Sequence, residues 1–373
     1  MPKKTIHLVS LDVPFPPDYG GMTDVFYRLK ALHELGFSII LHCFTYGRGK
    51  PKELNKYCEK IYFYNRKKQI KHFFSKRPFI VESRRSKLLL NNLLQDNFPI
   101  LLEGLHCCYF LEHPEITKKT VLVRTHNIEH KYYKGLSQDA FGWKKLFFKL
   151  EAKKLKSYET ILSKADYLLT INQEEQIHFK KINASCFYLP ASLPQPNSKK
   201  LTKPKNYVLF HGNLSVPENQ KAVFFLLKKV IPHIPEITFY IAGKNPNSKL
   251  ISLAEKQNAK VIANPSQEEM DQLIAHAKIH VLPAVYSTGL KLKLLAALQS
   301  SGITIANDIM FKGNDLEKYC IKANTPEEFI SAIKFHYKKP IDLPHRKKQI
   351  ENFLNEINPK KHLNNIFKEI ELF

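Results

Sequence analysis

Short apolar runs alternate with stretches of helical periodicity along the chain. Over Val25–Leu32 the apolar residues recur at helical spacing, and Gly36 stands where such a helix would end. Apolar runs separated by helical stretches are typical of parallel strands joined by crossover helices. In the first half of the chain, the runs predict strands over Thr5–Ser10, Ser38–Phe44, Pro99–Glu103, Thr120–Arg124, Tyr167–Ile171 and Cys186–Leu189.

The alternation is interrupted by the polar, proline-containing segment Ala191–Asn206, which is typical of an interdomain linker. After this segment, helices are predicted over Glu218–Ile231 and Leu290–Gln299, and strands over Tyr207–His211, Ile237–Ala242, Lys278–Pro283 and Ile303–Ala306. The sequence therefore predicts an α/β protein with a Rossmann-like domain on each side of the linker. Its expected parts are residues 1–190, the linker 191–206, residues 207–344, and C-terminal helices over 345–373 that cross back to the first domain.

Length and composition support this division. The chain has 373 residues, too many for one ordinary domain, and 43 % of them are hydrophobic, enough for sizeable cores. Its six cysteines form no Cys-x-x-Cys pair, which favours buried thiols in a reducing compartment. No apolar stretch approaches the roughly 20 residues that span a bilayer, and Asp12 interrupts the N-terminal apolar run. We therefore expect a cytoplasmic protein whose membrane contacts are peripheral.

The charge is strongly unbalanced, with 58 Lys and Arg against 34 Asp and Glu, a net charge of +24. Such an excess implies an anionic partner: nucleic acid, an acidic membrane or a phosphorylated substrate. Two basic stretches with interleaved aromatic residues, Arg66–Lys87 and Phe141–Lys156, suit an anionic membrane surface. The second stretch could equally be a core-packed helix with a lysine-rich outer face. A nucleic-acid partner is not expected, because no helix-turn-helix, zinc-finger or RNA-recognition signature is present.

The first candidate site follows the first predicted strand, where Gly20 and Gly21 open a helix in the sequence PPDYGG. Glycine lets the backbone approach a ligand closely, and the first helical N–H groups favour an anion. The alternative is a tight turn that needs glycine for its geometry alone. The motif is not G-x-G-x-x-G, so a nicotinamide site is not expected.

The second candidate site is VRTHNIEHKYY, which follows the end of a buried strand. Ligands of open α/β sheets bind outside the carboxyl ends of strands, where His126 and Asn127 could bond a sugar hydroxyl or a phosphate. A purely structural His126 is the alternative. Glu129 and His130 are side chains that could bind a metal ion. Their spacing is not that of a metal site and a third carboxylate is missing, so no metal is predicted.

Two further motifs lie in the second half of the chain. Gly212 and Asn213 follow its first strand and precede a helix, which suits an anion. In VYSTGLKLKLLAAL, a small-residue turn precedes a helix whose first turns carry Lys291 and Lys293. Backbone N–H groups and lysines together would hold a diphosphate, although helix lysines are often only a solvated face.

In their order along nearly the whole chain, these motifs resemble the family 4 type of retaining glycosyltransferases with the GT-B fold. SKADYLLTINQEE, YLP and IAGKNP extend the resemblance. It implies two Rossmann-like, doubly wound domains that face a cleft. It also implies transfer of a sugar from a nucleotide diphosphate sugar to a saccharide or lipid-linked acceptor, with retention, without a bound metal or other cofactor. Surface polysaccharide or glycolipid synthesis at the inner face of the membrane would be the setting.

The resemblance implies a role for each matching residue. His126 would contact the donor sugar and Lys293 the diphosphate, as catalytic groups. Other donor contacts would come from Gly20, Gly21, Gly212, Asn213, Asn264, Pro265, Ser287, Thr288, Gly289 and Lys291. Acceptor contacts would come from Asp18, Glu103, Asn127 and Glu129.

One departure from the family pattern bears on activity. The family commonly has two glutamates eight positions apart around the last helix, where this chain has Thr288 and Ala296. A carboxylate that accepts hydrogen bonds from ribose would contribute about 1.5–3 kcal/mol. Either the donor contacts lie elsewhere, or donor binding is weak, or the protein is a degenerate member that binds a sugar nucleotide or a partner without catalysis.

Overall fold

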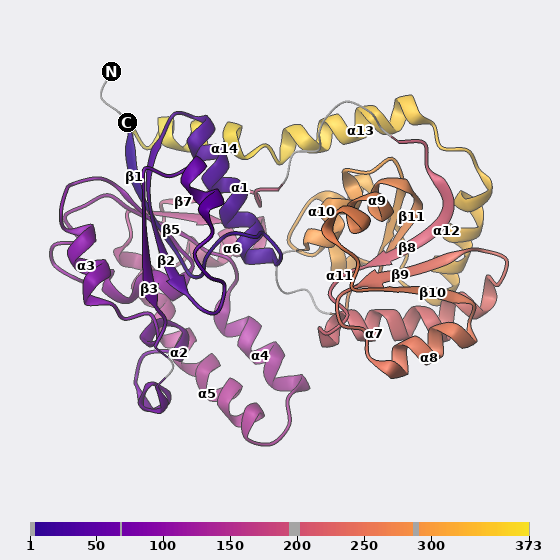
Figure 1. Cartoon of the computed structure of the whole chain (residues 1–373), viewed down its shortest axis with the longest axis horizontal. Helices are drawn as coiled ribbons and strands as arrows, with labels where there is room; N and C mark the ends of the chain where they lie inside the picture. Colours follow the sequence, from indigo (N-terminus) through magenta and orange to yellow (C-terminus); the bar gives the residue numbers. More distant parts are fainter. Residues whose placement is uncertain (1–3, 68, 194–201, 286–290, 373) are drawn as a thin grey trace. The chain divides into compact units, whose positions relative to one another are not determined.

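The apolar runs of the sequence form two parallel β-sheets, each in its own unit of the chain (Figure 1). The computed structural model describes residues 4–67, 69–193, 202–285 and 291–372. Of these, residues 4–193 and 357–372 form the first unit, and residues 202–285 and 291–356 form the second.

The first unit has a seven-stranded sheet in the order β3-β2-β1-β4-β5-β6-β7, with every neighbouring pair parallel. Its strands are β1 (Thr5–Ser10), β2 (Ser38–Thr45), β3 (Lys60–Asn65), β4 (Ile100–Glu103), β5 (Val121–Arg124), β6 (Tyr167–Thr170) and β7 (Cys186–Tyr188). Its α-helices are α1 (Gly20–Glu34), α2 (Phe79–Glu82), α3 (Lys87–Leu93), α4 (Glu129–Asp139), α5 (Gly142–Tyr158), α6 (Gln173–Phe179) and α14 (Pro359–Glu369). Short 3-10 helices are η1 (Lys52–Lys56), η2 (Ile70–Phe74), η3 (Leu105–Phe110) and η4 (Glu159–Lys164).

Helices cover both faces of this sheet, and successive strand residues point to opposite faces. Leu101 and Leu122 pack against α1 and α14, which lie side by side (Figure 1). Leu102 and Val123 pack in a second cluster that includes residues of α3 and α5. This double burial explains why the central strands are apolar at consecutive positions.

The second unit repeats the arrangement with a six-stranded parallel sheet in the order β10-β9-β8-β11-β12-β13. Its strands are β8 (Lys205–His211), β9 (Phe239–Gly243), β10 (Ala259–Ala263), β11 (Ala277–Leu282), β12 (Ile303–Ala306) and β13 (Ile321–Lys322). Its α-helices are α7 (Pro217–Phe225), α8 (Ser248–Lys256), α9 (Gln267–His276), α10 (Leu292–Leu298), α11 (Asp308–Phe311), α12 (Pro326–Lys338) and α13 (Leu343–Glu356). The π-helix η5 (Leu226–Val230) continues α7, and η6 (Ile231–His233) and η7 (Leu316–Tyr319) are 3-10 helices.

Both sheets have the same winding. The first three strands of each unit progress to one side, and the fourth then pairs on the other side of the first. This reversal defines a doubly wound fold, so the predicted α/β class with two Rossmann-like sheets is confirmed.

The sequence analysis missed three strands, β3, β10 and β13, and each is an edge strand of its sheet. Both β3 and β10 carry a short apolar run, but most of their positions are exposed or only partly buried, as is usual at the edge of a sheet. The basic stretch Phe141–Lys156 lies almost entirely on one helix, because α5 runs from Gly142 to Tyr158, and η4 follows it.

The ends of the predicted linker belong to folded parts. Ala191, Ser192 and Leu193 are buried in the first unit, and β8 already begins at Lys205. Residues 194–201 lie outside the described residues. The C-terminal tail forms two helices that divide between the units, α13 in the second and α14 in the first.

Within the described residues, every helix is too short or too polar to cross a lipid bilayer.

Candidate functional site

In the first unit, the carboxyl ends of β4 and β5 bring candidate residues together. Glu103 is the last residue of β4, Arg124 is the last residue of β5, and His126 follows two positions later. The side chains at this edge meet two residues of α1, Asp24 and Arg28, which lie one helical turn apart. In sheets of this kind, ligands bind at this edge.

These five residues form a buried ionic network. The Arg28 guanidinium donates to Glu103 at 2.8 and 2.7 Å and to both carboxylate oxygens of Asp24 at 3.0 Å. Arg124 donates to Asp24 Oδ2 through Nε at 3.2 Å and Nη2 at 3.1 Å. His126 Nε2 lies 2.9 Å from Glu103 Oε2, and its Nδ1 lies 3.8 Å from Asp24 Oδ2. The network therefore fixes the orientation of the His126 ring.

Opposite charges keep both carboxylates ionised despite their burial. Burial alone would raise the pKa of Asp24, but Arg124 and Arg28 outweigh it and hold that pKa well below its usual range. The pKa of Glu103 is lowered in the same way by Arg28 and His126 against the effect of burial. Such a network adds little net stability, but removing one member leaves a buried charge without its partner.

The other predicted residues of this edge lie close by. Asn127 has a buried Oδ1 atom without a hydrogen-bond donor among the described residues. Burial and the neighbouring Glu175 raise the pKa of Glu129 to about 8, so this side chain is mostly a neutral acid at pH 7. Glu103 has both oxygens occupied by Arg28 and His126, and its predicted contact with an acceptor stays a prediction.

The glycine loop precedes α1, which begins at Gly20 without a side-chain cap and without an acidic residue in its first turn. The first N–H groups of this helix therefore have no side chain that neutralises them. Asp18 is paired with Arg48 at 2.7 Å, and Arg48 also donates to the Val13 carbonyl at 2.9 Å. These contacts hold the loop against the segment that follows β2.

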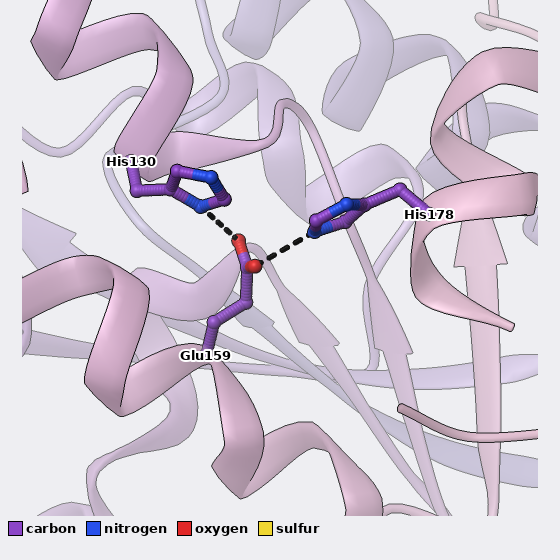
Figure 2. A group of neighbouring side chains, drawn as sticks. All are labelled: His130, Glu159 and His178. Atoms are coloured by element: carbon purple, nitrogen blue, oxygen red, sulfur yellow. Dashed lines mark hydrogen bonds and ion pairs between the residues drawn. The ribbon is translucent and has the colours of Figure 1, made fainter. Parts of the chain in front are cut away.

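A second polar group of the first unit joins three helices (Figure 2). Glu159 is buried, and its two oxygens lie 3.2 Å from His130 Nδ1 and 2.8 Å from His178 Nε2. Two histidines and a glutamate are a donor set that zinc uses, and the ligand atoms lie within 4.8 Å of one another. The carboxylate is also fully satisfied by the two rings alone, so the group links α4, η4 and α6 without an ion.

In the second unit, the ends of β8 and β9 approach each other closely. A Cβ atom on Gly243 would lie 1.8 Å from the carbonyl oxygen of Gly212, so only glycine fits at the end of β9. The helix predicted from Glu218 begins at Pro217 as α7, and residues 212–216 form a loop that separates Gly212 from its first turn. Asn219 Nδ2 donates to the Asn213 carbonyl at 2.8 Å and holds this loop to α7.

Lys293 and Lys291 differ in their partners. Lys291 Nζ forms an ion pair with Glu218 at 2.9 Å, whereas Lys293 Nζ donates to the neutral Asn219 Oδ1 at 2.8 Å. Lys293 also lies over the Phe210 ring, 5.3 Å from its centroid. Burial lowers the pKa of Lys293 to about 8, with Glu218 acting in the opposite direction. Its positive charge is therefore the less compensated of the two.

The remaining predicted donor residues divide between described and undescribed parts. Asn264 follows β10 directly at a φ of 53°, and its Oδ1 accepts a hydrogen bond from the Asn245 N–H at 2.7 Å. Pro265 comes next in the same loop. Ser287, Thr288 and Gly289 lie outside the described residues.

Comparison with known families identifies the second unit. Residues 205–339 match the family described as Glycosyl transferases group 1. The whole chain also has the fold of solved GT-B glycosyltransferases. The second unit is thus similar to the group 1 glycosyltransferases, and the chain as a whole has the GT-B fold.

The chain has a curated relative and several structural neighbours over nearly its full length. An uncharacterized 44.6 kDa protein in the cps region of Klebsiella pneumoniae is 29 % identical, and the match covers 98 % of this chain and 99 % of that protein. TarM of S. aureus has a TM-score of 0.66 at 13 % identity, over 99 % of this chain and 98 % of TarM. Sucrose-phosphate synthase of Thermosynechococcus elongatus has a TM-score of 0.65 at 13 % identity, over 98 % and 99 %. Anabaena HepE, solved with UDP and glucose, has a TM-score of 0.62 at 10 % identity, over 99 % and 98 %.

The sequence analysis missed both arginines of the buried network, and it also missed Asp24. Arg124 ends an apolar strand, and a charged residue in such a strand implies a buried partner. Asp24 and Arg28 are spaced for an ion pair within one helix, which was a second usable signal.

Proposed function

We propose that this glycosyltransferase transfers a sugar from a nucleotide diphosphate sugar to a saccharide or lipid-linked acceptor, with retention of the anomeric configuration. The second unit binds the donor, and the first unit binds the acceptor. UDP in the solved complexes of HepE and TarM supports a nucleotide donor. The Klebsiella relative in the cps region supports a role in surface polysaccharide synthesis.

The charge of Lys293, which is less compensated than that of Lys291, is the observation that carries the donor proposal. Among the described residues, Lys293 donates to a neutral amide, so a diphosphate can bind it without displacing a carboxylate. Lys291 would first have to leave Glu218. The loop that follows β8 lies beside Lys293. Because β8 and β9 approach each other closely at Gly212 and Gly243, this loop supplies backbone groups beside the lysine. We assign the diphosphate to Lys293 and this loop.

The proposed mechanism is electrostatic. As the bond to the sugar breaks, negative charge develops on the departing nucleoside diphosphate, and Lys293 stabilises it without help from a metal ion. The acceptor attacks on the face from which the nucleotide leaves, which retains the configuration. The ionised carboxylates of Asp24 and Glu103 are both fully occupied by arginines, so neither is proposed as a covalent nucleophile.

A degenerate, non-catalytic glycosyltransferase is the second candidate. Ala296, which lies on α10, offers no carboxylate for a ribose. Nucleotide binding and sugar transfer, measured separately, distinguish the two candidate functions. A thermal-shift screen against UDP, GDP and CMP and their sugars should give a higher melting temperature with one base, through ligand linkage. No shift with any nucleotide at millimolar concentration would contradict both candidates, whereas a shift without sugar transfer would support the degenerate one.

We further propose that the first unit binds an anionic membrane surface at the inner face of the membrane. In Figure 1, α4 and α5 form a hairpin that projects from the sheet. Large apolar side chains on and beside α5 are exposed: Phe141 by 87 %, Trp143 by 70 %, Leu146 by 60 % and Leu150 by 52 %. Exposed lysines on the same helix flank them: Lys144, Lys145, Lys149 and Lys153.

This apolar stripe argues against α5 being only a core-packed helix with a lysine-rich outer face. Phe74 of η2 is 85 % exposed as well, and its neighbour Phe73 packs on Phe147 of α5, with 5.3 Å between ring centroids. Apolar side chains flanked by lysines fit an interface with acidic lipid. Co-sedimentation with anionic vesicles should fall with added salt and with Trp143→Ala. Equal binding to neutral vesicles would contradict the proposal.

A further inference from the structure

Arg84 is a buried arginine without a carboxylate partner. The residue is 4 % exposed, and its Nε and Nη1 donate to the carbonyls of Leu11 at 2.9 Å and Ile80 at 2.7 Å. Among the described residues, no carboxylate lies within ion-pair distance of it. Arg28 and Arg124 are equally buried in the same unit, and both are paired with Asp24. Because a buried charge without a counter-charge is costly, Arg84 requires a separate explanation.

A second cation lies beside it. Arg66 follows β3 directly, its Nε donates to Ser83 Oγ at 3.0 Å, and its guanidinium lies over the Tyr46 ring, 4.8 Å from the centroid. It too has no ion pair with a carboxylate in the described part of the chain. Burial and the charge of Arg66 lower the pKa of Arg84 to about 10, so both side chains stay charged at neutral pH. Two like charges are therefore held together.

The acids and the imidazole near Arg84 do not neutralise the pair. Asp12 accepts hydrogen bonds from the Val13 N–H at 2.8 Å and the Tyr19 hydroxyl at 3.0 Å, and its single charge acts on Arg66 and Arg84 from beyond ion-pair distance, so it offsets only part of their two charges. Glu129 is largely protonated at pH 7 because of its raised pKa. Burial and Arg84 lower the pKa of His106 well below its usual value, so that ring is neutral.

The pair lies at the edge of the sheet where α/β proteins bind ligands. Arg66 follows β3, Leu11 follows β1 at one position past its end, and His106 lies in η3 just after β4. In this sheet, the winding reverses between β1 and β4, and such a reversal opens a crevice for ligands. Arg66 and His106 are partly exposed and the neighbouring Tyr19 is 42 % exposed, so the buried Arg84 adjoins residues that solvent reaches.

We propose that Arg66 and Arg84 bind a phosphate group of the acceptor. This inference rests on the proposed function, because it assigns the ligand of the acceptor unit. A phosphate or diphosphate carries the nearly two negative charges that balance two guanidinium groups, and its oxygens match their planar donors. The substrate class is therefore a phosphorylated or diphosphate-linked acceptor, not a neutral saccharide.

The test measures binding of inorganic pyrophosphate to the full-length chain by isothermal titration calorimetry. All variants carry Lys293→Met, so that the proposed donor site does not contribute. In this background, Arg66→Gln and Arg84→Gln should each raise the Kd at least tenfold, equivalent to about 1.4 kcal/mol. The matched control is Arg85→Gln, which removes the next arginine in the sequence; Arg85 is 57 % exposed and lies 3.8 Å from Glu82. This control should change the Kd less than twofold.

Three outcomes would overturn the proposal. The first is pyrophosphate binding that Arg66→Gln and Arg84→Gln leave unchanged, and the second is an equal loss in the Arg85→Gln control. The third is the absence of pyrophosphate binding once Lys293 is replaced. If Arg84→Gln does not fold, Arg66→Gln decides alone, because Arg66 is only partly buried.

Two further measurements distinguish this proposal from the proposed donor site and from the proposed membrane surface. The first is UDP binding with Lys293 intact, which should be the same in the wild type and in Arg66→Gln. If the protein binds pyrophosphate through the arginines but binds no nucleotide, the proposed function is wrong and the phosphate site remains. Vesicles of phosphatidylglycerol test the other source of phosphate. If Arg66→Gln weakens vesicle binding while pyrophosphate does not bind, the arginines bind lipid headgroups of the membrane surface, and the acceptor assignment is wrong.

Discussion

The partial burial of Lys293 predicts an unusual pH dependence of donor binding. Burial lowers the pKa of this lysine to about 8, so raising the pH from 7 to 9 removes most of its charge in the free protein. A bound diphosphate stabilises the charged form, and binding above pH 8 must therefore take up a proton. With a fully charged lysine in the complex, linkage gives a loss of UDP affinity of about tenfold between pH 7 and pH 9. The phosphates of UDP, with a last pKa near 6, stay ionised over this range.

Isothermal titration calorimetry at pH 7, 8 and 9 measures this effect, and two buffers with different heats of ionisation report the proton. At pH 8, uptake of about half a proton is expected, because half of the free lysine is then uncharged. Lys293→Arg is the matched control, since its guanidinium stays charged throughout and should remove the pH dependence. Lys293→Met should bind weakly at every pH. Wild-type affinity that is constant from pH 7 to pH 9, without proton uptake, would refute the assignment of Lys293 to the diphosphate.

Three further predictions concern other parts of the chain. Arg28→Met leaves Asp24 and Glu103 without their shared partner and should lower the free energy of unfolding by about 3–5 kcal/mol in a urea titration; a loss under about 1 kcal/mol would contradict the buried network. Gly243→Ala places Cβ 1.8 Å from the Gly212 oxygen and should lower the melting temperature, whereas Gly135→Ala, whose Cβ meets nothing within 4 Å, should not. Because Glu159 is satisfied by His130 and His178, dialysis against EDTA should leave the melting temperature unchanged; a zinc-dependent rise that His178→Ala abolishes would instead show a metal site.

The sequence was sufficient for the strands that are buried on both faces. Short apolar runs such as Leu8–Val9 and Ile39–Leu41 predicted β1 and β2, which the structure has there. The edge strands β3 and β10 also carry apolar runs, Ile61–Tyr64 and Val261–Ala263, but these strands are exposed or only partly buried at most positions, and the sequence analysis did not predict them. The helices α9 and α12 begin with capping boxes at Ser266 and Thr325, and the Ser/Thr-x-x-Glu spacing of these boxes was visible in the sequence.

The candidate sites were predictable only where the chemistry is local. Glycine before a helix and lysines in a first turn are patterns within a few residues, and they pointed to Gly20 and Lys293. The pair Arg28–Glu103 joins residues 75 positions apart, and no short pattern contains both. The spacing of Glu129 and His130 predicted no metal site, and no short pattern contains the group that the structure forms, in which His130 meets Glu159 and His178 from two other helices.

Net charge shows most clearly what the three-dimensional structure adds. A count of +24 treats Lys291 and Lys293, or Arg28 and Arg84, as equivalent charges. Their partners make them different, because Lys291 and Arg28 are neutralised by carboxylates while Lys293 donates to an amide and Arg84 to two carbonyls. An anion gains most where a positive charge is already desolvated and still unpaired, since it then displaces neither water nor a competing carboxylate. By this criterion, we propose these few inward-facing cations as the specific anion sites of the protein, and the exposed lysines of α5 as a source of attraction to a charged surface that does not select a ligand.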